Sequence, residues 1–246
     1  MNDAKYYVLS ALAALIALTV HEYAHGYAAY KLGDDTAKNM GRLSLNPMKH
    51  LDPIGTVCMI LFHVGWARPV PIDPRYFKKP KRGFALAALA GPLSNIILGF
   101  LGAGAYLFAY ALLRDVSFPS ENLAYNLASN LLLFLFIFHS VNIGLGVFNL
   151  LPIPPFDGSR LLNVILPDKL YFGIMKYERQ IYLGVLGWLL LGDVVKRALL
   201  SVPFIAASPV LSLVAGIFSL SDLLSLAIGG LSTLIIKLWQ LIPFLA

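Results

Sequence analysis

The clearest chemical signal in this sequence is HEYAH at residues 21–25. On an α-helix, residues four apart project from one face about 40° from each other, so the imidazoles of His21 and His25 can reach the same ion. Glu22 is then placed to take a proton from a metal-bound water, as in zinc-dependent hydrolases. We therefore expect two zinc ligands and a general base. The alternative is a helix end at which these side chains only reach the membrane interface near Lys31.

A catalytic zinc normally has three protein ligands, so one more must come from elsewhere in the chain. The first helix offers none, because Ala28 and Lys31 stand where an extended HExxHxxGxxH motif has glycine and histidine. Asp157 is the preferred candidate, since the stretch NLLPIPPFDG at 149–158 contains three prolines that restrict its backbone, and Gly158 lets the chain turn away. The alternative role for Asp157 is an N-cap for residues 159–166. By side-chain type, the remaining candidate ligands are His50, His63, His139 and the other carboxylates.

Asn95, Asn142 and Asn149 bring amide side chains into segments that are largely apolar. Asn95 follows the glycine-proline pair at 91–92, which permits a close helix approach and frees a backbone carbonyl. Asn95 either donates to a developing oxyanion or substrate backbone, or forms a hydrogen bond between helices. Asn149 begins the proline-rich stretch. Asn142 and His139 lie earlier in the same apolar segment, and we expect them to form a buried polar seam.

These residues must be positioned by helices that cross a membrane, because the chain is too apolar for a water-exposed surface. The AVILMFWYC fraction is 58%, the charged fraction is 13% and the mean hydropathy is +0.73, whereas soluble domains carry about 25% charged residues. A spanning helix needs about 20 mostly apolar residues. The segments that meet or nearly meet this length are 5–30, 84–113, 124–150, 181–200 and 222–245. A sixth segment, 204–220, is either a short span or half of a broken one.

Residues 51–66 are apolar but too short for an ordinary span. Basic residues flank both ends, so we expect this segment to enter the membrane and return on the same side, packed against the site helices. A short additional span is the alternative. The predicted fold class is therefore an all-α polytopic membrane protein with about five to six transmembrane helices. Its first two core helices would be separated by a membrane-associated re-entrant or β segment.

The positive charge is concentrated in residues 31–83, which hold ten Lys or Arg and four acidic residues and so account for the whole net charge of +6. Between apolar segments, such a loop indicates the positive-inside rule and contact with anionic lipid head groups rather than nucleic acid. We expect a multi-pass protein of the cell membrane, with the active site toward the cytoplasm. The single cysteine, Cys58, excludes an intramolecular disulfide and a multi-cysteine metal site.

Together these motifs resemble the site-2 protease family of intramembrane zinc metalloproteases, in a compact form without a PDZ or CBS domain. The motifs match in order: HExxH at 21–25, GWARPVP at 65–71, GPxxN at 91–95 and NxxPxxPxDG at 149–158. The resemblance covers about residues 6–166. It implies one catalytic zinc ion and a transmembrane protein substrate, partly unwound and received as an added strand by the stretch 38–75. The implied site residues are His21, His25 and Asp157 for zinc, Glu22 for the zinc-activated water, and Asn95 and Asn149 for substrate or oxyanion positioning.

We therefore expect an intramembrane zinc endopeptidase that hydrolyses peptide bonds within or next to transmembrane segments of substrate proteins, as in regulated intramembrane proteolysis. Residues 1–166 would form the metalloprotease core, and residues 167–246 additional C-terminal transmembrane helices. The alternative function is a divalent-cation carrier with His21, His25 and Asp157 as its transit site, although a carrier usually needs acidic residues along a whole path. An inactive scaffold is disfavoured because it has no need of Glu22. Nothing in the sequence indicates the oligomeric state.

Overall fold

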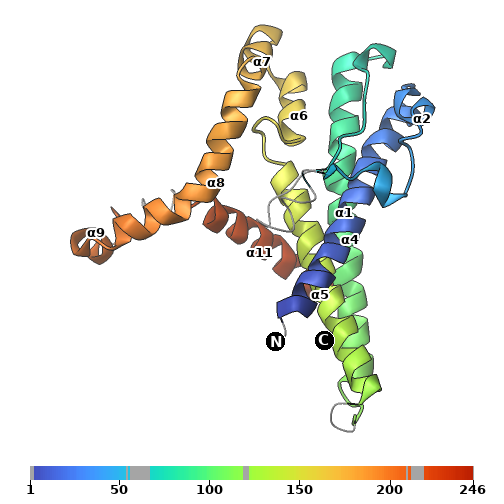
Figure 1. Cartoon of the computed structure of the whole chain (residues 1–246), viewed down its shortest axis with the longest axis vertical. Helices are drawn as coiled ribbons and strands as arrows, with labels where there is room; N and C mark the ends of the chain where they lie inside the picture. Colours follow the sequence, from blue (N-terminus) through green and yellow to red (C-terminus); the bar gives the residue numbers. More distant parts are fainter. Residues whose placement is uncertain are drawn as a thin grey trace.

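Three long helices pack side by side, and the C-terminal helices extend from them (Figure 1). The computed structural model describes residues 3–53, 55, 67–118, 122–208, 210–211 and 219–245. These residues are mostly helical, and no named strand occurs among them. The elements are α1 (Asp3–Lys31), α2 (Thr36–Asn39), η1 (Pro47–Lys49), η2 (Pro74–Tyr76), α4 (Pro80–Leu113), α5 (Leu123–Asn149), α6 (Gly158–Ile165), α7 (Asp168–Met175), α8 (Glu178–Leu200), α9 (Pro203–Ala207), α11 (Leu220–Trp239) and η3 (Pro243–Leu245).

The bundle of α1, α4 and α5 positions the site, and small residues set how closely its helices approach. A methyl group added at Gly99 of α4 would lie 2.5 Å from Cδ1 of Ile143 on α5. One added at Gly146 of α5 would lie 2.9 Å from Cγ1 of Ile96 on α4. Since lipid tails are as apolar as these side chains, close van der Waals contact is what holds such helices together.

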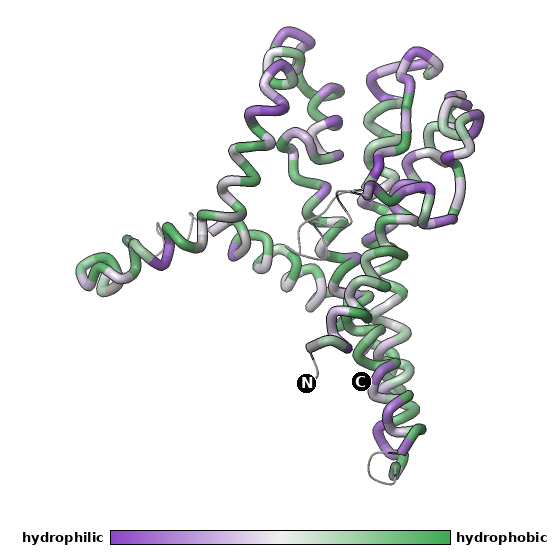
Figure 2. Tube along the Cα trace, in the orientation of Figure 1, coloured by the Kyte–Doolittle hydropathy of each residue, from purple (hydrophilic) through white to green (hydrophobic). Residues whose placement is uncertain are grey.

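Four helices are long and apolar enough to cross a membrane, so the chain is an integral membrane protein. They are Ala4–Lys31, Pro80–Leu113, Leu123–Asn149 and Asp222–Trp239. Hydrophobic residues cover the middle of the bundle, and hydrophilic residues gather toward the two ends of α4 (Figure 2). The expected five to six spans are therefore corrected to four in the part of the chain that the structure describes.

The segment 181–200 accounts for part of this difference. It does form a helix, α8, but any 18-residue stretch of α8 contains at least three charged residues. Charged side chains are costly in the hydrocarbon core, which is why α8 does not qualify as a span. The sixth segment, 204–220, forms α9 at its start, and most of its remainder lies outside the described residues.

The expected re-entrant segment can be followed only at its two ends, because residue 54 and residues 56–66 lie outside the described residues. Leu51 and Ala67 form an isolated antiparallel bridge, and the amide of Arg68 donates to the carbonyl of His50 at 2.8 Å. The two ends of this segment therefore lie next to each other, while the predicted entry into the membrane falls on residues outside the described part of the chain. The predicted β structure is limited to this single bridge among the described residues.

The last span, α11, returns to the bundle. The indole nitrogen of Trp239 donates to the carbonyl of Phe100 on α4 at 2.9 Å, and the two rings are in contact. Lys196 of α8 forms an ion pair with Asp222 of α11. These contacts attach the C-terminal helices to the bundle without any part in the cluster described next.

Candidate metal centre

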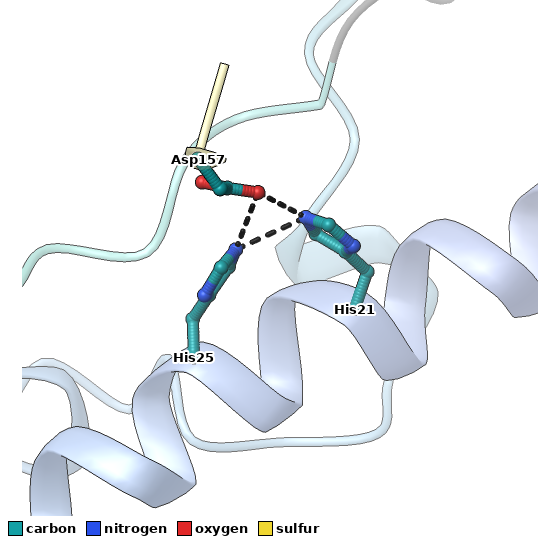
Figure 3. Close-up of side chains that lie close together, drawn as sticks. All are labelled: His21, His25 and Asp157. Atoms are coloured by element: carbon teal, nitrogen blue, oxygen red, sulfur yellow. Dashed lines mark hydrogen bonds and ion pairs between the residues drawn. The ribbon is translucent and has the colours of Figure 1, made fainter. Parts of the chain in front are cut away.

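His21 and His25 lie one turn apart in the C-terminal third of α1, and both point toward Asp157 (Figure 3). Their Nε2 atoms are 3.0 Å apart. Oδ2 of Asp157 lies 3.1 Å from Nε2 of His21 and 3.3 Å from Nε2 of His25. Among the described residues, no other set of three His, Cys, Asp or Glu side chains brings its ligand atoms together in this way. The structure thus joins the helical motif to a carboxylate 132 residues further along the chain.

Asp157 reaches the histidines because the chain turns tightly between α5 and α6. It occupies the N-cap position of α6 with φ −58° and ψ −35°, but its side chain makes no capping hydrogen bond. A Cβ at Gly158 would lie 2.5 Å from the backbone carbon of Leu150, so glycine is needed where the two segments pass. The carboxylate therefore faces the imidazoles and does not cap the helix.

Each imidazole is held through its second nitrogen by an acceptor on α4. Nδ1 of His25 donates to the carbonyl of Ala87 at 2.8 Å, and Nδ1 of His21 lies 2.6 Å from Oδ1 of Asn95. The amide nitrogen of Asn95 donates to a backbone carbonyl of α1 at 3.1 Å and to Oδ1 of Asn142 at 3.0 Å. Because both amide hydrogens of Asn95 are engaged, its Oδ1 must accept a hydrogen bond from Nδ1–H of His21. Both Nε2 atoms therefore keep a free lone pair directed at the cluster.

Asn95 is fully buried behind His21 and does not line the cavity in front of the ligands. Of its two expected roles, the hydrogen bond between helices is the one seen. Asn142 on α5 continues this polar seam, and Nδ1 of His139 lies 2.8 Å from the carbonyl of Gly99. The expected seam exists, and it leads directly to one of the candidate metal ligands.

The other histidines lie outside the cluster or outside the described residues. Nε2 of the buried His50 lies 2.7 Å from the carbonyl of Ser44, in the loop before the bridge. His139 belongs to the polar seam. His63 lies outside the described residues. Asp157 is thus the third side chain that the structure brings to His21 and His25.

Gly91 provides the space in which the two imidazoles sit against α4. A Cβ at this position would lie 2.5 Å from Cε1 of His25 and 2.8 Å from Cε1 of His21. The buried Pro92 follows it inside the helix, and Asn95 lies one turn further on. The GPxxN motif therefore supplies a gap for the ligands and, one turn later, the acceptor that orients His21.

A cavity of about 340 Å³ opens in front of the three ligands. Its other polar lining residues are Glu22, Asn149 and Arg160, and apolar residues between 69 and 88 complete it. Oε2 of Glu22 accepts a hydrogen bond from the amide of Val70 at 2.8 Å. Both Glu22, the expected base, and Asn149, the expected positioning residue, therefore face the same space as the ligands.

The donor set fits a zinc ion. Two neutral imidazole nitrogens and one carboxylate oxygen form a ligand set of catalytic zinc sites, with one position left open. Metal binding requires an ionised carboxylate and neutral imidazoles, and the Nδ1 hydrogen bonds leave both Nε2 atoms unprotonated in the neutral rings. When the rings instead carry a proton on Nε2, burial by itself raises the pKa of Asp157, but the hydrogen bonds from His21 and His25 outweigh burial and lower that pKa.

Several groups that hold the site could not be found from side-chain types. The carbonyl of Ala87 and the amide of Val70 are backbone groups, which any residue supplies. Arg160 lines the cavity and pairs with Glu178 at 2.8 Å, whereas the sequence placed it only among the basic residues of a loop. Its position three residues after Asp157, on the first turn of α6, is the signal that could have placed it at the site.

Comparison with known proteins places these features in a family. The family model for peptidase family M50 matches residues 9–170. YwhC of Bacillus subtilis, named as a candidate zinc metalloprotease, is 44% identical over 172 residues, or 68% of this chain and 75% of YwhC. The zinc metalloprotease MJ0392 of Methanocaldococcus jannaschii is 27% identical over 72% of this chain and 39% of its own length. Rip2 of Mycolicibacterium smegmatis, also named as a candidate zinc metalloprotease, is 29% identical over 37% of this chain and 36% of its own. No solved structure matches the chain.

Proposed function

Because this chain belongs to peptidase family M50, we propose that it is an intramembrane endopeptidase that hydrolyses peptide bonds within or next to transmembrane segments of other proteins. As a member of the family it is a zinc metalloprotease. The observation that carries the proposal is the meeting of His21, His25 and Asp157 on and beside helices long and apolar enough to cross a membrane.

His21 and His25 would hold zinc through Nε2, and Asp157 through Oδ2. When bound, zinc lowers the pKa of a coordinated water and polarises a carbonyl oxygen. The chain's own contribution is orientation. The acceptors on α4 fix both imidazole rings, and the turn before α6 fixes the carboxylate, so little freedom is lost when the ion enters.

Glu22 is proposed to take the proton from water and to pass it to the leaving amine. Glu22 is a buried residue, 8% exposed, and it lines the cavity, which keeps bulk water from competing for its carboxylate. Oε2 is engaged by the amide of Val70, whereas no described residue donates to Oε1. This division supports a carboxylate with one oxygen fixed and the other free to accept the proton.

Asn149 and the segment 67–73 are proposed to position the substrate. Asn149 lines the cavity, with its amide nitrogen donating to the carbonyl of Leu145 at 3.1 Å. Pro69, Val70 and Ile72 line the same cavity from the other side, which supports pairing of an unwound substrate with the stretch 38–75. Asn95 is proposed to act through His21, because it lies behind that ring.

The location and extent of the enzyme are part of the same proposal. His21 and His25 lie toward the end of α1 from which the basic stretch 31–83 continues, which supports an active site toward the cytoplasm and contact with anionic lipids. Residues 1–166 would form the protease core. The helices after residue 166 would be an addition that contributes no ligand to the cluster.

The test is cleavage by the purified chain in lipid vesicles. Single-span test proteins with helix-breaking residues at different depths would be offered with zinc to wild type and to Glu22→Gln. We expect cleavage by wild type and a loss of about 10²- to 10⁴-fold in Glu22→Gln with zinc content unchanged. Equal cleavage by both would contradict the role of Glu22. Zinc flux into the vesicles without any cleavage would instead favour the carrier function.

A further inference from the structure

One peptide group links the proposed base to a buried arginine. The amide of Val70 donates to Oε2 of Glu22 at 2.8 Å. The carbonyl on the other side of the same peptide bond belongs to Pro69, and it accepts from a terminal guanidinium nitrogen of Arg42 at 3.3 Å. The same nitrogen donates to the carbonyl of Arg68 at 2.7 Å. A cation and a carboxylate thus lie on the two sides of one peptide unit.

The position of Arg42 is built by the fold and is not that of a solvated loop residue. Gly41, two residues after the end of α2, has φ +64°, in the left-handed region, and the amide of Arg42 then donates to the carbonyl of Ala37 at 2.8 Å. Arg42 is a buried residue, 8% exposed, and none of the ion pairs among the described residues includes it. Burial and then the charge of Arg68 lower the pKa of Arg42, while the Glu22 carboxylate opposes that fall.

Hydrogen bonds that follow one another through a peptide group strengthen one another. A cation at the carbonyl oxygen draws electron density from the amide nitrogen, and the N–H then becomes a better donor. Resting on the proposed function, we infer that Arg42 is a positioning residue for the base Glu22, acting through the Pro69–Val70 peptide. Arg42 touches neither the cavity nor the ligands; it fixes which oxygen of Glu22 is engaged and which is left for the proton.

Holding the segment 67–73 in place is a different role, and the chain offers a control for it. Oδ2 of the buried Asp34 accepts from the amide of Asp73 at 2.7 Å, so Asp34 anchors the same segment three residues beyond Val70. The described hydrogen bonds of the Asp34 carboxylate come from the amides of Thr36 and Asp73, and none comes from the Pro69–Val70 peptide. If Arg42 acts on Glu22 through the Pro69–Val70 peptide, variants of Arg42 should lose activity only where Glu22 is present. Variants of Asp34 should not show this dependence.

The kinetic test is a double-mutant cycle on the full chain in vesicles. For Arg42→Met we expect kcat to fall about 10- to 100-fold, with KM and zinc content close to wild type. In a Glu22→Gln background the same change should alter the residual kcat less than about twofold, because a residue that acts through Glu22 has nothing left to act on. Arg42→Lys, which keeps the charge and a donor, should recover most of the loss. Asp34→Asn should have the same effect in both backgrounds.

The outcomes separate the two roles. An equal loss of kcat in both backgrounds, or a rise in KM with kcat unchanged, would overturn the inference in favour of a substrate or folding role for Arg42. If Arg42→Met does not fold, Arg42→Gln keeps an amide donor without the charge and is judged by the same two criteria. Arg82→Met removes an exposed guanidinium from the same end of the bundle and should leave kcat unchanged.

A second measurement does not depend on catalysis. The sequence contains two Pro–Val pairs, Pro69–Val70 and Pro209–Val210, so ¹³C-proline with ¹⁵N-valine labelling selects two amide signals. The Val70 proton should move upfield in Glu22→Gln and also in Arg42→Met, while the Val210 signal serves as the internal reference. If Arg42→Met leaves the Val70 signal unchanged, the inference fails even where the protease is active. If the shift is seen without any cleavage, the proposed function fails and the link between Arg42 and Glu22 stands.

Discussion

Replacing Gly91 by alanine tests whether the crossing of α1 and α4 sets the geometry of the metal ligands. The added methyl carbon would lie 2.5 Å from Cε1 of His25 and 2.8 Å from Cε1 of His21, closer than carbon atoms approach without a shift. The His25 ring cannot simply turn away, because its Nδ1 donates a hydrogen bond to the carbonyl of Ala87, which lies on α4 one turn before Gly91. Either the helices separate or the ligands leave their positions.

The cost follows from the packing. Forcing an extra methyl group into a filled contact costs about 1 to 3 kcal/mol. If the whole cost falls on the metal-bound geometry, zinc affinity drops about 5- to 140-fold, at tenfold for each 1.4 kcal/mol. The assay is competition for zinc with a chelator of known affinity, on detergent-purified wild type and Gly91→Ala. Thermal unfolding of both proteins would be measured in parallel.

Gly99→Ala is the matched control, since it adds the same methyl group to the same helix two turns later. There the methyl carbon would meet Cδ1 of Ile143 at 2.5 Å, so helix packing is perturbed without contact with an imidazole. We expect Gly99→Ala to lower stability and to keep the wild-type zinc affinity. A wild-type zinc affinity in Gly91→Ala would refute the reasoning, as would an equal loss in Gly99→Ala.

Three further outcomes are expected. Asp157→Ala should lose zinc on purification, whereas Asp168→Ala, which removes an exposed partner of Lys81, should retain it; zinc analysis that finds full occupancy in Asp157→Ala would show that the third ligand lies elsewhere. Asn95→Ala should weaken zinc binding about 10- to 100-fold in the chelator assay, because His21 loses the acceptor that fixes its tautomer; unchanged affinity would remove that role. On acidification, zinc should be released, because carboxylate and imidazole ligands must be deprotonated to bind it. Zinc content that stays unchanged from about pH 7 to about pH 4 would contradict this expectation.

The chemical centre was accessible from the sequence because its signals are local. The spacing of His21 and His25 is a property of one helix turn, and the prolines before Asp157 mark a restricted carboxylate. What the sequence could not supply is the direction in which a buried amide faces. Asn95 turns its oxygen to His21 only because its two hydrogens are taken by α1 and Asn142, and those partners are distant in the chain.

The errors in the predicted fold have a different cause. Hydropathy identified the helix of α8, but it did not weigh the charges at its two ends, so a helix was counted as a span. The loop residue Arg42 was counted as one of many cytoplasmic charges, since composition cannot tell a solvated arginine from a residue that is 8% exposed. In both cases the role of a charged residue depends on the residues and solvent around it in the folded protein, which composition and hydropathy do not describe.

The two imidazoles stand on α1, and both of their orienting acceptors, with Gly91 between them, stand on α4. The geometry of the metal ligands therefore depends on how far apart α1 and α4 lie. By thermodynamic reciprocity, anything that favours one crossing of α1 and α4 must change zinc affinity, and zinc binding must favour that crossing to the same degree. Bilayer thickness acts on the tilt of such helices. Zinc affinity would thus depend on the thickness of the membrane that surrounds the enzyme.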